Sequence, residues 1–132
     1  MTTDKVEMGL GPYVEHLGLR FEEIGPDRVV AGWSVRGDLL QPHGILHGGV
    51  HCAVVESVAS VAADHWLGER GTVVGVSNTT DFFAPVTEAN GRLTSTAVPV
   101  HRGATQQVWA VETVDAVGSL VARGQVRLQN LR

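Results

Sequence analysis

The sequence predicts an α+β domain in which one long helix packs against one antiparallel sheet. Residues 48–66 have the apolar spacing of a helix, two strand-like runs precede them, and three or four valine-rich strand-like runs follow. Because a helix and a sheet each bury one apolar face, this order of elements favours one helix packed on one sheet.

The segments before the long helix are short. Residues 11–18 predict a short helix, and residues 19–25 and 28–37 predict two strands separated by a Gly-Pro-Asp turn. Residues 38–46 predict a loop, since Pro42 disfavours helical backbone at the residue before it.

The long helix at 48–66 is expected to end at Gly68, a plausible C-cap. Strand-like runs then alternate with turn-like connectors, EANG and DAVG. We expect consecutive antiparallel strands at residues 71–85, 91–101, 106–116 and 119–131.

Composition bounds the class of protein. The chain has 132 residues, of which 43% are hydrophobic, so residues 1–132 predict one domain with its core at about 17–130. A net charge of -4 without a basic run argues against nucleic acid as a partner. The first eleven residues lack a signal-peptide pattern and no stretch approaches 18 apolar residues, so we expect no membrane association. The one cysteine, Cys52, excludes an internal disulfide and favours a cytoplasmic location.

The long helix carries an unusual polar arc. At about 100° per residue, one face is apolar and is expected to pack on the sheet: Val50, Val54, Val55, Val58, Val61, Ala62 and Trp66. The opposite arc holds Ala53, Glu56, Ser57, Ser60, Asp64 and Leu67. This arc is either the solvated side or a contact surface. Since it has small residues at its centre and no Lys or Arg, we infer that it faces a second copy of the chain, with Glu56 at the interface as a candidate base or nucleophile.

The helix begins with His-Gly-Gly. Gly48 and Gly49 lie in the first turn, where backbone N–H groups have no partner within the helix and the helix dipole favours negative charge. A carbonyl oxygen could approach and develop charge against these N–H groups, as in an oxyanion hole. The alternative is a tight entry to the helix that needs glycine for geometry alone.

Two further patterns are set aside. His43, His47 and His51 are spaced by four residues, but glycines and a proline interrupt any helix through all three, so we expect no metal site. Cys52 lies on an apolar helix and is expected to be a small core residue and not a nucleophile.

Three segments carry a resemblance to a known family: QPHGILHGGVHCAVVESVASVA, VVGVSNTTDFFAPV and PVHRGATQQVWAV. Together they resemble the hotdog-fold acyl-CoA thioesterases of the PaaI-like group. The branch is that of the enterobactin proofreading thioesterase, 1,4-dihydroxy-2-naphthoyl-CoA hydrolase and one type of 4-hydroxybenzoyl-CoA thioesterase. The likeness covers about residues 17–128, and its most specific part is Gln-Pro-x-Gly-x-x-His-Gly-Gly with a glutamate seven residues after the last glycine.

The resemblance implies a hotdog fold, in which an antiparallel sheet of five or six strands wraps around the long central helix. It implies a homodimer with edge-to-edge sheets and interfacial active sites, often paired into a homotetramer, and no cofactor. Glu56 would be the catalytic carboxylate, as nucleophile or as general base, and the Gly48 N–H would polarise the thioester carbonyl. Gln41 and His47, from the subunit opposite Glu56, would hold the thioester or water, and Ser60 would orient water or the acyl group.

The resemblance also implies contacts to the substrate and its coenzyme A. The matching positions are Gly49, Phe82, Phe83, Ala84, His101, Arg102, Gly103, Ala104 and Thr105. This sequence departs from its relatives at two of them, because they place a histidine at the position of Phe82 and a basic residue at that of Thr105.

The expected function is therefore hydrolysis of an acyl-CoA, with an aryl or medium-chain acyl group, to the free acid and CoA. Two alternatives stay open: a non-catalytic acyl-CoA-binding hotdog protein, and a thioesterase that acts on acyl groups attached to a carrier protein.

Overall fold

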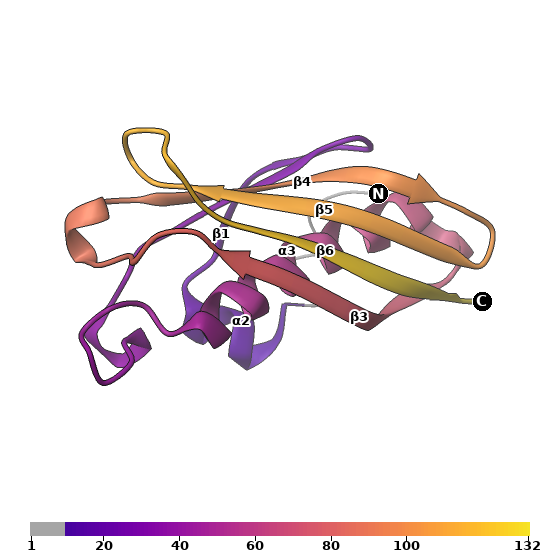
Figure 1. Cartoon of the computed structure of the whole chain (residues 1–132). Coiled ribbons are helices and arrows are strands. Elements are labelled where there is room, and N and C mark those ends of the chain that lie inside the picture. The colour runs from indigo at the N-terminus through magenta and orange to yellow at the C-terminus, as the bar shows by residue number, and fades with distance from the viewer. Residues whose placement is uncertain (1–9) are drawn as a thin grey trace.

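The computed structural model describes residues 10–132, in which six strands form one antiparallel sheet (Figure 1). The strands are β1 (Arg20–Ile24), β2 (Val29–Trp33), β3 (Thr72–Phe82), β4 (Leu93–Arg102), β5 (Gln106–Val114) and β6 (Leu120–Leu131). Their order in the sheet is β1-β2-β4-β5-β6-β3. The predicted α+β fold, with its five or six strands, is confirmed.

The position of β3 differs from the simple expectation of consecutive strands. β3 pairs with the last strand, β6, from Thr72 opposite Leu131 to Phe82 opposite Ala122, and not with β4. It therefore forms one edge of the sheet, as Figure 1 shows. Val74 and Val76 of this strand are about half exposed.

The long helix α3 (Gly48–Leu67) packs on the concave side of the sheet and ends before Gly68, as predicted (Figure 1). Its fully buried residues are Val54, Val55, Val58, Ala59, Ala62 and Ala63. Three residues of the predicted faces are corrected: Leu67 is buried, whereas Val61 and Trp66 are only partly buried. The polar arc is confirmed at its centre, because Glu56 is exposed and Ser57 and Ser60 are partly exposed. Among residues 10–132, no helix is long and apolar enough to cross a membrane.

The predicted short helix is α2 (Gly11–Leu17), and Gly18 ends it in the left-handed conformation with φ of 78°. The predicted loop at 38–46 begins in a 3-10 helix, η1 (Gly37–Leu39), while η2 (Gly68–Arg70) and η3 (Glu88–Asn90) lie in later connections.

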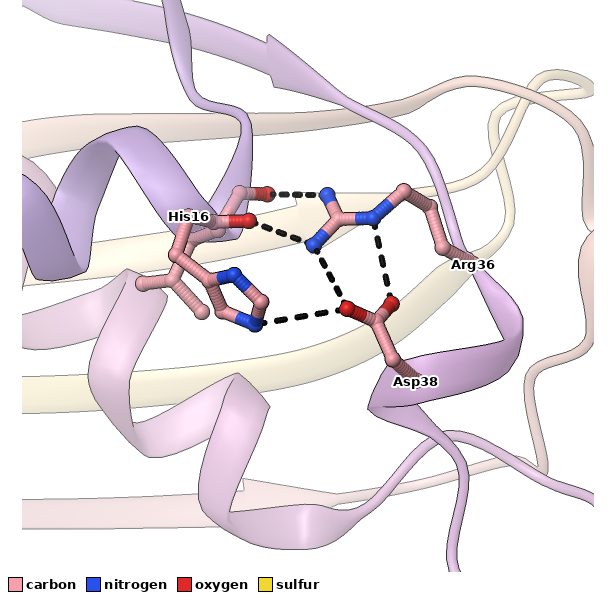
Figure 2. Close-up of polar contacts among 4 residues, drawn as sticks. His16, Arg36 and Asp38 are labelled. Atoms are coloured by element: carbon pink, nitrogen blue, oxygen red, sulfur yellow. Dashed lines mark hydrogen bonds and ion pairs between the residues drawn. The ribbon is translucent and has the colours of Figure 1, made fainter.

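An arginine ties α2 to this loop. The Arg36 guanidinium donates to the carbonyl oxygens of His16 and Leu17 and pairs with the Asp38 carboxylate at 3.2 Å (Figure 2). The hydrogen bond from Arg36 lowers the pKa of Asp38. These contacts fix the chain just before Gln41, the first predicted site residue.

Candidate active site

The start of α3 presents a free backbone donor. His47 is the N-cap, and its Nδ1 accepts a hydrogen bond from the Gly49 N–H at 2.8 Å. The next N–H, of Val50, donates to the His47 carbonyl. Among the described residues no group accepts from the Gly48 N–H, so this donor at the positive end of the helix dipole is available to a substrate oxygen.

Close contacts explain why both positions are glycine. A Cβ at Gly48 would overlap the Phe82 ring, and a Cβ at Gly49 would lie 2.9 Å from Nδ1 of His47. The two interpretations of the sequence therefore both have support: geometry requires the glycines, and one of the two N–H groups is left free. Gly49 itself cannot serve as an oxyanion donor while His47 caps it.

A cavity of about 460 Å³ opens beside this N–H group. It is lined by Gln41, Ile45, Leu46, Gly48, His51, Phe82, Phe83, Ala84, Pro85 and Val86. Five predicted site residues, Gln41, Gly48, Phe82, Phe83 and Ala84, thus lie together. The lining is mainly apolar, as expected for a pocket that holds an acyl group.

Sequence reasoning considered His51 only as a metal ligand and missed that it lines this cavity. His51 is 3% exposed, and burial lowers its pKa from 6.5 to about 4, so its imidazole is neutral at physiological pH. Its helical spacing, three residues after Gly48, was the signal that could have placed it beside the cavity.

Glu56 lies farther along α3, against the edge strand β3. At Gly75, β3 has no side chain where it passes the Glu56 carboxylate. A Cβ added there would lie 3.5 Å from the Glu56 carboxyl carbon. Ser60 is one turn beyond Glu56 on the same helix and is partly exposed, as predicted.

A polar chain from β3 reaches the Glu56 carboxylate. The Asn78 amide N–H group donates to the Cys52 carbonyl at 3.0 Å and lies 3.5 Å from Glu56 Oε1. The Thr80 hydroxyl donates to Asn78 Oδ1 at 2.7 Å. Because Thr80 occupies the amide oxygen, the Asn78 NH₂ group is directed toward Glu56. Cys52, expected in the core, is partly buried.

One chain does not bring the two ends of the predicted site together. Gly48 and Glu56 are eight residues apart on a continuous helix, which separates them by about 12 Å along its axis. An attacking group must lie about 3–3.5 Å from the carbonyl carbon. The Glu56 of one chain therefore cannot attack a carbonyl held by the Gly48 of the same chain.

The predicted CoA residues 101–105 lie at the other end of the sheet from Phe82. Arg102, the last residue of β4, pairs with Gln107 of β5, and Gln107 pairs with Leu128 of β6. Leu128 in turn pairs with Gly75, so this end of β4 lies at the same end of the sheet as the start of β3 (Figure 1). Arg102 pairs with Asp27 at 2.9 Å and donates to the Pro26 carbonyl. These contacts already engage the guanidinium of this predicted CoA-binding residue.

The rest of this connection is held in place by hydrogen bonds. The Asn130 amide donates to the carbonyl oxygens of Gly103 and Ala104, and the Asn130 backbone N–H donates to that of Thr105. His101 lies at the end of β4 and is exposed. Residues 101–105 are thus an ordered surface, but not part of the cavity of their own chain.

The fold and this geometry define a hotdog-fold thioesterase. Residues 43–122 match the thioesterase superfamily, and the chain belongs to that family. It is similar to 1,4-dihydroxy-2-naphthoyl-CoA hydrolase of Escherichia coli, with 36% identity over 113 residues that cover 86% of this chain and 82% of the relative. It is also similar to Rv1847 of Mycobacterium tuberculosis, with 52% identity over 123 residues that cover 91% of this chain and 86% of the relative.

A solved structure shares the fold. The crystal structure of S. sahachiroi AziG matches with a TM-score of 0.92 and 85% identity over 93% of this chain and 98% of that one. The predicted fold and family are therefore confirmed.

Proposed function

We propose that the protein hydrolyses an acyl-CoA thioester at a site formed by two subunits. The observation that carries the proposal is the separation of Glu56 from the Gly48 N–H of its own chain, by about 12 Å along α3. Both groups face open surface, and a second copy of the chain can supply the missing half to each.

The free edge of β3 supports this arrangement. Two β3 strands that pair antiparallel across a two-fold axis place the start of one beside the end of the other. The start of β3 lies near residues 101–105, and its end is Phe82, at the cavity. Pairing therefore brings the CoA-binding candidates of one subunit, His101, Arg102, Gly103, Ala104 and Thr105, toward the cavity of its partner.

In the proposed reaction the thioester carbonyl oxygen accepts a hydrogen bond from the Gly48 N–H, which stabilises the negative charge that develops there. Glu56 acts in one of two ways. As nucleophile it attacks the carbonyl carbon, the C–S bond breaks, and water hydrolyses the resulting anhydride. As general base it takes a proton from water as the water oxygen attacks the same carbon, and the CoA thiolate leaves and is protonated.

The neighbouring residues hold the reactants. Because His47 Nδ1 accepts from Gly49, its neutral imidazole carries the proton on Nε2, which is then a donor for the thioester or the attacking water. Gln41 lines the cavity and Ser60 is one turn from Glu56, so each can orient the acyl group or water. The apolar cavity and the similarity to 1,4-dihydroxy-2-naphthoyl-CoA hydrolase of E. coli favour an aryl acyl group.

The test is thiol release from a panel of aryl- and alkyl-CoA esters by the wild-type protein and by Glu56→Gln. We expect the variant to lose on the order of 10²-fold or more in kcat, because the substitution keeps the shape and removes the base or nucleophile. Asp64→Asn, which removes another carboxylate from the same helix, is the matched control and is expected to keep its activity.

Two outcomes would contradict the proposal. If Glu56→Gln retains near-wild-type activity, Glu56 is not the catalytic group. If the wild type cleaves no CoA ester but cleaves thioesters of the same acyl groups on a carrier protein, the enzyme recognises the carrier protein and not CoA.

A further inference from the structure

The buried imidazole of His51 has no role in the proposed reaction, yet it lines the acyl cavity. Its Nδ1 is sealed from solvent and, within residues 10–132, has no hydrogen-bond partner. A neutral imidazole has one donor and one acceptor nitrogen, and no hydrogen bond joins this ring to a described residue. Nε2 is not sealed, so it is the nitrogen that a ligand in the cavity can reach, and a hydrogen bond there would pair a polar group that otherwise costs free energy.

Aromatic contacts hold the ring in place. The Phe82 ring stacks on it with centroids 5.5 Å apart and planes at 24°, and the Trp33 ring meets it edge-on at 6.1 Å. Phe82 also covers Gly48, where a Cβ would overlap its ring. His51 is therefore a fixed polar group in a mainly apolar wall, one helical turn from the proposed oxyanion donor.

We infer that His51 is a specificity-determining residue that hydrogen-bonds a hydroxyl group on the acyl moiety of the substrate. A hydroxyl both donates and accepts, so it can pair with Nε2, the ring nitrogen that is not sealed, in either neutral tautomer. The stacked Phe82 and the apolar lining accept the flat hydrocarbon part, which points to a hydroxylated aryl acyl group. This inference rests on the proposed function, because it takes the cavity to be the acyl site.

The test compares matched pairs of esters: benzoyl-CoA and 2-naphthoyl-CoA, each with and without a ring hydroxyl at successive positions. For the wild type we expect kcat/KM to be at least about tenfold higher for one hydroxylated isomer than for its parent, since a site built to bond a hydroxyl rejects the analogue without it. In His51→Leu this ratio should fall close to one, and His51→Gln, which keeps a hydrogen-bonding group, should restore part of it.

His65→Leu is the matched control. His65 also lies on α3 and also has a buried Nδ1 without a partner among the described residues, but it does not line the cavity. The variant should leave the hydroxyl preference unchanged. Equal kcat/KM values for every pair in the wild type, or a His51→Leu variant that keeps the wild-type ratio, would overturn the inference.

Binding separates this inference from the proposed function. If no ester is hydrolysed, the same pairs are titrated against the wild type and His51→Leu and followed by tryptophan fluorescence, for which Trp33 lies against His51. A hydroxyl preference in Kd that His51→Leu removes would support the role of His51 although hydrolysis had failed. A wild type that binds both members of each pair equally, or binds neither, would overturn it.

Discussion

At the scale of residues, the Glu56 carboxylate is contacted by a polar side chain of the edge strand β3. Asn78 bridges it to the Cys52 carbonyl, and Thr80 fixes the direction of the Asn78 amide. A carboxylate that attacks a carbonyl or takes a proton from water needs a defined position, and this chain supplies one from the sheet edge. We therefore regard Asn78 as a positioning residue for Glu56.

Asn78→Asp should lower kcat about 10-fold to 100-fold with a smaller change in KM, because it removes the donor and places a second negative charge 3.5 Å from Glu56. The repulsion should also move the acidic limb of the kcat–pH profile to higher pH. Steady-state kinetics from pH 4 to 8 would measure both. Thr79→Val is the control, and an unchanged pH profile in Asn78→Asp would contradict the positioning role.

The sequence alone singled out Glu56 and Gly48 as candidates because both break the local pattern of a helix. It could not identify Asn78, which is 22 residues from Glu56, because the contact depends on where the edge strand crosses the helix. His51 was missed for a related reason: its spacing from Gly48 places it near the start of the helix, but the cavity that it lines is formed by residues from distant segments.

At the scale of elements, the start of α3 and the end of β3 fit closely. The Phe82 ring packs where a Cβ of residue 48 would lie. This contact sets the spacing between the helix N-terminus and the wall of the cavity. A larger residue at position 48 must move the ring.

Gly48→Ala should reduce the free energy of unfolding by about 1–3 kcal/mol, as overpacked substitutions do. The cost should be smaller in a Phe82→Ala background, where the overlapping ring is absent. Urea denaturation of the four proteins measures this coupling. Gly37→Ala, at a position with open space around it, is the control. Equal costs in both backgrounds would show that the ring contact does not explain the glycine.

Element types were largely predictable, because the 3.6-residue and two-residue periodicities are local properties of the chain. The pairing of β3 with β6, and hence the free edge of β3, was not, because strand order depends on contacts between distant segments. The helical wheel placed Leu67 on the polar arc, but this residue in the last turn of α3 is buried.

At the scale of the whole molecule, His51 couples stability to pH. Its pKa is about 4 in the folded protein and 6.5 ordinarily, so between these values the unfolded chain binds more protons. The contribution of the neutral imidazole to the free energy of unfolding is therefore fully present above about pH 6.5. It is lost as the pH falls toward 4.

Relative to His51→Leu, the wild type should lose stability on acidification from pH 7 to pH 4, by at most on the order of 3 kcal/mol. Urea denaturation of both proteins at several pH values isolates this contribution, because other titrating groups are common to both. Parallel pH dependences for the two proteins would contradict a buried, neutral His51.

The free edge of β3 predicts assembly through that strand. Val76→Asp places a charge on the half-exposed edge and should convert the proposed dimer to monomers and abolish hydrolysis together. Light scattering coupled to size-exclusion chromatography measures the mass. Val117→Asp, in the exposed turn between β5 and β6, is the control. A monomeric Val76→Asp protein with full activity would argue against an interfacial site.

The most direct test of a site shared between subunits is complementation. Glu56→Gln and Gln41→Ala chains, with different tags, are co-expressed, and heterodimers are isolated through both tags. Each homodimer should be inactive, whereas the heterodimer should regain about half of the wild-type rate of thiol release, because one of its two sites combines an intact Glu56 with an intact Gln41 from the partner. A heterodimer as inactive as its parents would contradict the account, since both residues would then have to come from the same chain.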